Sequence, residues 1–186
     1  MILENFSEDK ILSIIHNIEN TAINKDLDYF CLTRDVFQAR VDTYVSKNEK
    51  FLQSAIIGEI GNNCFDHNFE YDKKYLRGCY FNFDDKDFVI IADFGQGIKS
   101  SLAKVVECKD DLDALKIAFT KFISGRAPEQ RGNGLKFVAK SIAQNSWSMY
   151  FQSGNACCII DKDGTTFVES KNVVIGCFAI LDFKDK

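Results

Sequence analysis

Hydrophobic and polar positions along the chain follow a helical period in the first part and a strand period in the last part. Between residues 7 and 24, apolar side chains recur every three or four positions, which predicts a helix. The same period predicts shorter helices over residues 34–45 and 135–144 and a longer one over 49–69. Residues 98–121 also have helical spacing, with a charged stretch in the middle.

Strand signals are concentrated in two places. Apolar runs over 76–83 and 88–92 are separated by the polar residues 84–87, which predicts a hairpin. Four more strands, with turns at Asp163-Gly164 and Lys171-Asn172, are predicted over residues 147–151, 156–161, 165–169 and 173–183. Helices followed by hairpins, with one helix between them, predict an α+β fold with a largely antiparallel sheet.

The composition is that of an ordinary globular domain. The 186 residues are 46% hydrophobic and 27% charged, which is enough apolar material for one core and too much for a disordered chain. The net charge of −4 argues against a nucleic-acid-binding surface, and no apolar run approaches the roughly 20 residues that a membrane span needs. Seven cysteines without a Cys-x-x-Cys pair, and an N-terminus without a signal-peptide pattern, favour a cytoplasmic protein.

The helix predicted over 49–69 has polar groups on a face that begins apolar. On a helical wheel, Glu59, Asn63 and Asp66 share one arc. The apolar residues on that arc are Leu52, Ala55 and Ile56. One interpretation is a helix that emerges into solvent in its second half. The other is a site at the helix end, where Glu59 acts as a base and Asn63 offers its carbonyl oxygen to a hard cation such as Mg²⁺.

Two glycine-containing segments stand where a ligand can approach the backbone. The strand over 88–92 ends in Asp93-Phe94-Gly95-Gln96-Gly97, so an acidic acceptor is followed by two glycines. A dinucleotide-binding fingerprint is excluded because Ser100 stands at the place of its third glycine. The second segment, Arg131-Gly132-Asn133-Gly134-Leu135, opens the helix over 135–144, where free backbone N–H groups suit a phosphate. By itself it is better explained as a loop that caps the helix.

Together and in this order, Glu59-x-x-x-Asn63, Asp93-x-Gly95-x-Gly97 and Gly132-x-Gly134-Leu135 resemble the motifs of the GHKL ATPases. This superfamily contains the ATP-binding domains of gyrase-type, heat-shock chaperone, mismatch-repair and sensor histidine kinase proteins. The resemblance extends over roughly residues 51–183. It implies the Bergerat fold, a two-layer α/β sandwich in which helices cover one face of a mixed, mostly antiparallel sheet. Residues 99–131 correspond to the ATP lid, a mobile cover in the family.

The resemblance assigns a role to each matching residue. Glu59 corresponds to the general base, Asn63 to the Mg²⁺ ligand, and Asp93 to the aspartate that accepts from the adenine amino group. Residues 1–48 would be a helical extension packed on an ATP-binding domain of residues 49–186. The other residues expected to bind ATP are Asp66, His67, Gly95, Gly97, Ile98, Arg126, Arg131, Gly132, Asn133, Gly134 and Leu135.

His67 and Ser124-Gly125-Arg126 resemble in particular the small anti-sigma serine kinases of bacterial partner-switching systems. The implied function is Mg²⁺-dependent ATP hydrolysis or transfer of the γ-phosphate to a regulatory partner protein, STAS-like or sigma-factor-like, and a homodimer is compatible with it. The alternative is a non-catalytic module in which nucleotide binding changes the affinity for a partner protein. The chain departs from the family at Gly176-Cys177, where Gly-Thr is common. A thiol donates more weakly than a hydroxyl, so a phosphate contact at this position would be weaker.

Overall fold

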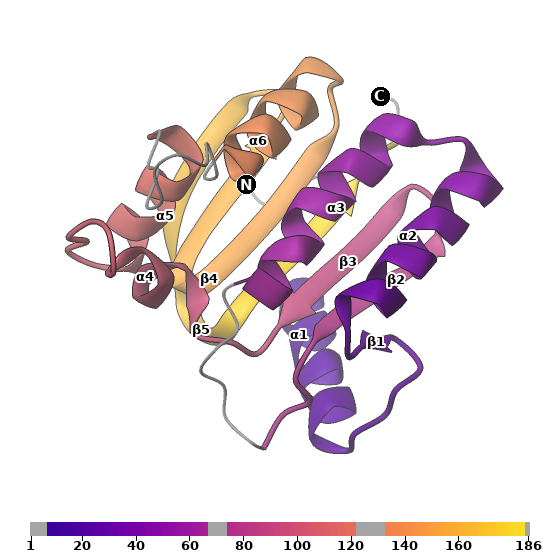
Figure 1. Ribbon diagram of the computed structural model, residues 1–186. Coiled ribbons are helices and arrows are strands. Elements are labelled where there is room, and N and C mark those ends of the chain that lie inside the picture. The colour runs from indigo at the N-terminus through magenta and orange to yellow at the C-terminus, as the bar shows by residue number, and fades with distance from the viewer. Residues whose placement is uncertain (1–6, 67–73, 122–132, 185–186) are drawn as a thin grey trace.

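The computed structural model describes residues 7–66, 74–121 and 133–184 (Figure 1). Within these ranges the chain folds into six helices and five strands. In chain order they are α1 (Glu8–Ile23), β1 (Phe30–Cys31), α2 (Arg34–Asn48), α3 (Phe51–Asp66), β2 (Cys79–Asp85), β3 (Phe88–Asp93), α4 (Gly97–Leu102), α5 (Asp111–Thr120), α6 (Gly134–Gln144), β4 (Ser148–Asp161) and β5 (Gly164–Asp182). The α+β fold class predicted from the hydrophobic pattern is confirmed.

The strands form one sheet in the order β1-β2-β3-β5-β4, and each neighbouring pair is antiparallel. The expectation of a mixed sheet is therefore wrong for the described part of the chain. Strands β3 and β4 do run in the same direction, but β5 lies between them and pairs antiparallel with both. The edge strand β1 is missed by sequence reasoning because two residues are too few to have a period.

The four strands predicted near the C-terminus are two long strands, β4 with 14 residues and β5 with 19. Lys171 and Asn172 do not form a turn. They lie in an irregular stretch of β5, where its register with β4 shifts. The Gln152 side-chain amide donates to the carbonyl of Asn172 at 2.7 Å and holds this stretch in place. The same polar residues that signal a turn therefore mark a bulge here.

Helices α2, α3, α5 and α6 cover one face of the sheet, and α1 lies behind the opposite face (Figure 1). The sheet and the first group of helices form the expected two-layer arrangement. Helix α1 differs from the expectation of helices on one face, because it buries its apolar stripe against the other face; the residues of the stripe are Ile11, Ile15, Ile18 and Ala22. None of the described helices is both long enough and apolar enough to cross a bilayer.

The buried face of α3 differs from the predicted one. Leu52 is 37% exposed, and Ala55 and Glu59 are exposed as well. The reason is the position of α2: Gly61, on the back of the wheel, lies against the ring of Phe37, and a Cβ there would come within 2.0 Å of the ring carbon Cζ. The residues of α3 that are buried are Ile56, Ile57, Ile60, Gly61 and Cys64. A wheel gives the spacing of side chains, but the neighbouring helix decides which face is covered.

The helix predicted over 98–121 is two helices, α4 and α5. The Asp110 carboxylate accepts from the N–H of Asp113 at 2.7 Å and so caps α5 at a new start. The buried side chains of α5 include Leu115 and Phe119, which belong to the main core. The described part of the expected ATP lid is therefore packed against the sheet in this structure, and whether it moves stays a prediction.

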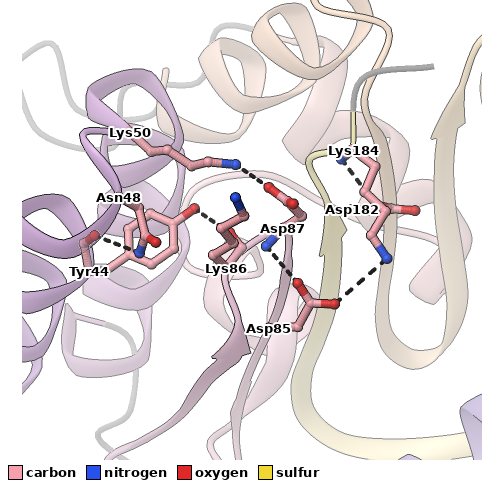
Figure 2. Close-up of polar contacts among 8 residues, drawn as sticks. All are labelled: Tyr44, Asn48, Lys50, Asp85, Lys86, Asp87, Asp182 and Lys184. Atoms are coloured by element: carbon pink, nitrogen blue, oxygen red, sulfur yellow. Dashed lines mark hydrogen bonds and ion pairs between the residues drawn. The ribbon is translucent and has the colours of Figure 1, made fainter.

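The turn between β2 and β3 anchors the end of β3 that is remote from the glycine motif (Figure 2). The hydroxyl of Tyr44 in α2 donates to the carbonyl of Lys86 at 2.9 Å. Lys50 forms an ion pair with Asp87. These contacts fix the start of β3 to α2 and to the residue that precedes α3, so the position of Asp93 at its other end is set relative to α3.

Candidate functional site

A pocket lies where α3, the end of β3, the start of α4 and β5 meet. Its walls are mostly apolar, with contributions from Ile60, Ile91, Ile98, Phe151, Phe178 and Ala179. The polar residues Asn63, Asp93, Gln96 and Ser101 also line it. The cavity volume is about 30 Å³, which is room for one or two water molecules. A larger ligand can enter only if α4 or lining side chains move.

Asp93 is the buried acid of this pocket, with 8% of its surface exposed. Its Oδ1 accepts from the N–H of Gly95 at 2.8 Å. Burial raises the pKa of the Asp93 carboxyl to about 7, although hydrogen bonds from Gly95, Cys64 and Cys177 act in the opposite direction. A carboxyl in this setting retains a strong hydrogen-bonding capacity among apolar neighbours, which suits the recognition of a polar edge on a flat ligand.

Two glycines with positive φ permit the close packing around Asp93. Gly97 has φ +73° at the start of α4, and a Cβ there would lie 3.0 Å from the hydroxyl oxygen of Ser153. Gly176 also has φ +73°, and a Cβ there would lie 2.2 Å from the backbone oxygen of Asp93. The sequence motif therefore explains only half of the arrangement, because Gly176 comes from the irregular stretch of β5.

Gly176→Ala is expected to destabilise the fold by about 2 kcal/mol or more, since the left-handed backbone and the contact with Asp93 both penalise a side chain. Urea unfolding followed by the fluorescence of Trp147, the only tryptophan, measures this effect. Gly164→Ala is the matched control for backbone strain, because Gly164 has φ +121° but open space around its Cβ position. A loss no larger than that of the control would contradict the packing described for Gly176.

Asn63 and Glu59 stand one helical turn apart on α3. Asn63 is half-buried and lines the pocket, whereas Glu59 is exposed and lies outside it. The Glu59 carboxylate instead lies beside the first residue of α6: a Cβ on Gly134 would come within 2.2 Å of Oε2. The structure thus brings Glu59 of the first motif next to Gly134 of the third, with Asn63 between Glu59 and the pocket along α3.

Among the described residues there is no cluster of three or more His, Cys, Asp or Glu side chains that could hold a metal ion. A Mg²⁺ ion bound to a nucleotide needs only one or two oxygens from the protein, because phosphates and waters complete its octahedron. Asn63 fits this requirement, since its amide is at the pocket and Glu59 is one turn away. The residues present therefore fit an ion that arrives with a nucleotide better than one held by the protein alone.

Of the other predicted site residues, Gly95 donates its backbone N–H to the Asp93 carboxylate, and Ile98 lines the pocket. Asp66 does not line the pocket; its carboxylate accepts from the Arg34 guanidinium of α2 at 2.5 Å. Leu135 is part of the main core, and Asn133 is exposed at the start of α6. His67, Arg126, Arg131 and Gly132 lie outside the described residues.

Three residues at the site are not predicted as site residues. Cys64 and Cys177 both line the pocket together with Asp93. The Ser153 hydroxyl accepts from the N–H of Ile98 at 2.9 Å. The sequence signals for them are weak: Cys64 directly follows Asn63, Cys177 stands where the family has Thr, and Ser153 precedes a glycine in a strand.

Comparison with models of known protein families gives no match, and no curated protein matches the chain. The chemistry of the site is therefore inferred from its own residues.

Proposed function

We propose that the chain is a Mg²⁺-dependent ATP-binding protein with the Bergerat fold of the GHKL ATPases. The observation that carries the proposal is the buried Asp93 carboxyl, which lies between two glycine segments in a mostly apolar pocket that Asn63 also lines. Apolar walls suit the faces of a purine, and Asp93 supplies an acceptor for its amino group. The α+β architecture, with helices on one main face of an antiparallel sheet, agrees with that fold.

The phosphates would extend from the pocket along α3 toward the start of α6. The Asn63 amide oxygen would bind Mg²⁺ there, and the ion would offset the negative charge of the phosphates. Gly134 leaves room beside Glu59 because it has no side chain. Backbone N–H groups in the first turn of α6 would suit phosphate oxygens, because the side chain of Asn133 does not cap this helix end.

Glu59 is the proposed general base. Its carboxylate is exposed and lies at the junction of α3 and α6, where an attacking water or a hydroxyl of a partner protein has access. Glu59 would hold that group in line and accept its proton. The same site therefore supports ATP hydrolysis or transfer of the γ-phosphate to a regulatory partner protein.

A second candidate function is a non-catalytic module that binds a partner protein according to its nucleotide state. The observation that favours it is the narrow cavity of about 30 Å³, because ATP entry would have to displace α4 or its side chains. A displacement of that kind changes the surface that α4 and α5 present.

Glu59→Gln is expected to bind Mg·ATP with nearly unchanged affinity and to lose turnover by about 100-fold or more, because the amide keeps the shape but cannot accept a proton. Phosphate release and labelling of protein from γ-labelled ATP in cell extract measure the two outcomes. Glu49→Gln, on the turn before α3, is the control. Equal turnover in wild type and Glu59→Gln would contradict the base role, and binding without turnover in the wild type would support the second candidate.

The test of ATP binding itself is a calorimetric titration of the full chain with ATP, with and without Mg²⁺. Saturable binding that is stronger with Mg²⁺ supports the proposal. A flat titration in both conditions would refute it.

A further inference from the structure

Ser153 lies on β4 with 4% of its surface exposed, and its hydroxyl is fully used. It donates to the carbonyl of Gly176 in β5 at 2.9 Å. It accepts from the N–H of Ile98, the second residue of α4, at 2.9 Å, and from the Cys177 thiol at 3.7 Å. A hydroxyl has one donor and two acceptor positions, so this side chain joins β4, β5 and the start of α4 with no capacity left.

The residues around Ser153 also form part of the pocket wall. Gly97, Ile98 and Cys177 all line it, and each of them contacts Ser153. Helix α4 has no fully buried residue of its own, although Ile98 is partly buried against the main core. The hydrogen bond from the N–H of Ile98 to Ser153 links the start of α4 directly to β4.

We propose that Ser153 is a positioning residue that holds α4 closed over the pocket, and that a nucleotide enters when this connection opens. The nucleotide part of the inference rests on the proposed function. The opening itself does not, because it follows from the narrow cavity and from the contacts of Ser153.

Opening of α4 would expose the two thiols that face the pocket, Cys64 and Cys177. Cys64 is the cleaner reporter, because Cys177 itself donates to Ser153. In Ser153→Ala, the hydrogen bonds to Ile98 and Gly176 are lost. Of the two, only the bond from the Ile98 N–H links Ser153 to α4. A typical intramolecular hydrogen bond changes an equilibrium by about fivefold, so the population of the open form should rise by about fivefold.

The experiment is alkylation of the full chain by iodoacetamide without nucleotide, with each cysteine followed by mass spectrometry. Ser153→Ala should label Cys64 about fivefold faster than wild type, while Cys158, with 0% exposed, keeps its slow rate as a reporter of global unfolding. Ser153→Thr, which keeps the hydroxyl, and Ser148→Ala, which removes a buried hydroxyl at the first residue of β4, should resemble wild type. Unchanged Cys64 labelling in Ser153→Ala, or equal acceleration at Cys158, would overturn the proposal.

The nucleotide arm uses a fluorescent ATP analogue in stopped flow, where Ser153→Ala should associate several times faster than wild type. If the wild type binds the analogue but Cys64 labelling does not respond to Ser153→Ala, the role of Ser153 is refuted and ATP binding stands. If Cys64 labelling responds as expected but the wild type binds no nucleotide, the opening stands and the proposed function fails. Slower association in Ser153→Ala would contradict the role of Ser153 as a barrier to entry.

Discussion

Asp93→Asn is expected to weaken ATP binding by about 10- to 100-fold at pH 8. At that pH the Asp93 carboxyl, with a pKa of about 7, is ionised, and a hydrogen bond to a charged acceptor contributes about 1.5–3 kcal/mol. An amide of the same shape retains one weaker acceptor oxygen and adds a donor that faces the donating amino group of adenine. Calorimetric titration with Mg·ATP measures the change in the dissociation constant.

Asp182→Asn is the matched control for this substitution. Asp182 is also a buried aspartate of the same sheet, with 4% of its surface exposed. It lies at the opposite end of β5, where it pairs with Phe88, whereas Asp93 pairs with Cys177. Affinity that is equal in Asp93→Asn and wild type, or that falls equally in both variants, would remove Asp93 from base recognition.

The second large expected effect is the dependence of folding stability on pH. The folded state holds the Asp93 proton up to pH 7 or so, whereas the unfolded chain releases it near 3.8. The unfolded state therefore binds fewer protons in this window, and the contribution of Asp93 to stability falls as pH rises from about 4 to about 7. The shift corresponds to about 4 kcal/mol as an upper estimate. Below pH 4 the contribution is fully present, and above pH 7 it is lost.

Other carboxyl groups also titrate in this range, so the informative quantity is the difference in unfolding free energy between wild type and Asp93→Asn. Relative to wild type, the variant should gain stability between pH 4.5 and pH 7.5, because it has no buried group to ionise. Urea unfolding followed by Trp147, which is 5% exposed, gives both free energies. A difference that is the same at both pH values would contradict the raised pKa of the buried Asp93 carboxyl.

The sequence predicts the parts of the site that lie at the ends of single elements. Asn63, Asp93, Gly97 and Ile98, which come from the first two motifs and their flanks, line one pocket. They converge because α3 packs over the end of β3. Both elements contribute buried residues to the main core. Such local motifs are visible because each consists of neighbours in sequence.

The contacts that cross the fold could not be predicted. The pairing of Asp66 with Arg34 joins residues far apart in the chain, and a helical wheel contains no information about the surface of α2. Gly176 lies against Asp93, and Ser153 against Gly176, in the region where β4 and β5 pair irregularly. The turn signal at Lys171-Asn172 conceals this irregular pairing. Buried cysteines are indistinguishable from small core residues in a sequence, so the thiols around Asp93 are found only in the structure.

The location of the nucleotide is tested most directly by thiol protection in the wild-type chain. Cys64 and Cys177 line the pocket, whereas Cys31 and Cys158 are 0% exposed and report global unfolding. If Mg·ATP binds in the pocket, it should slow the alkylation of Cys64 and Cys177 severalfold more than that of Cys31 and Cys158. Saturating Mg·ATP that leaves the labelling of Cys64 and Cys177 unchanged, or slows all four thiols equally, would contradict ATP binding at Asp93.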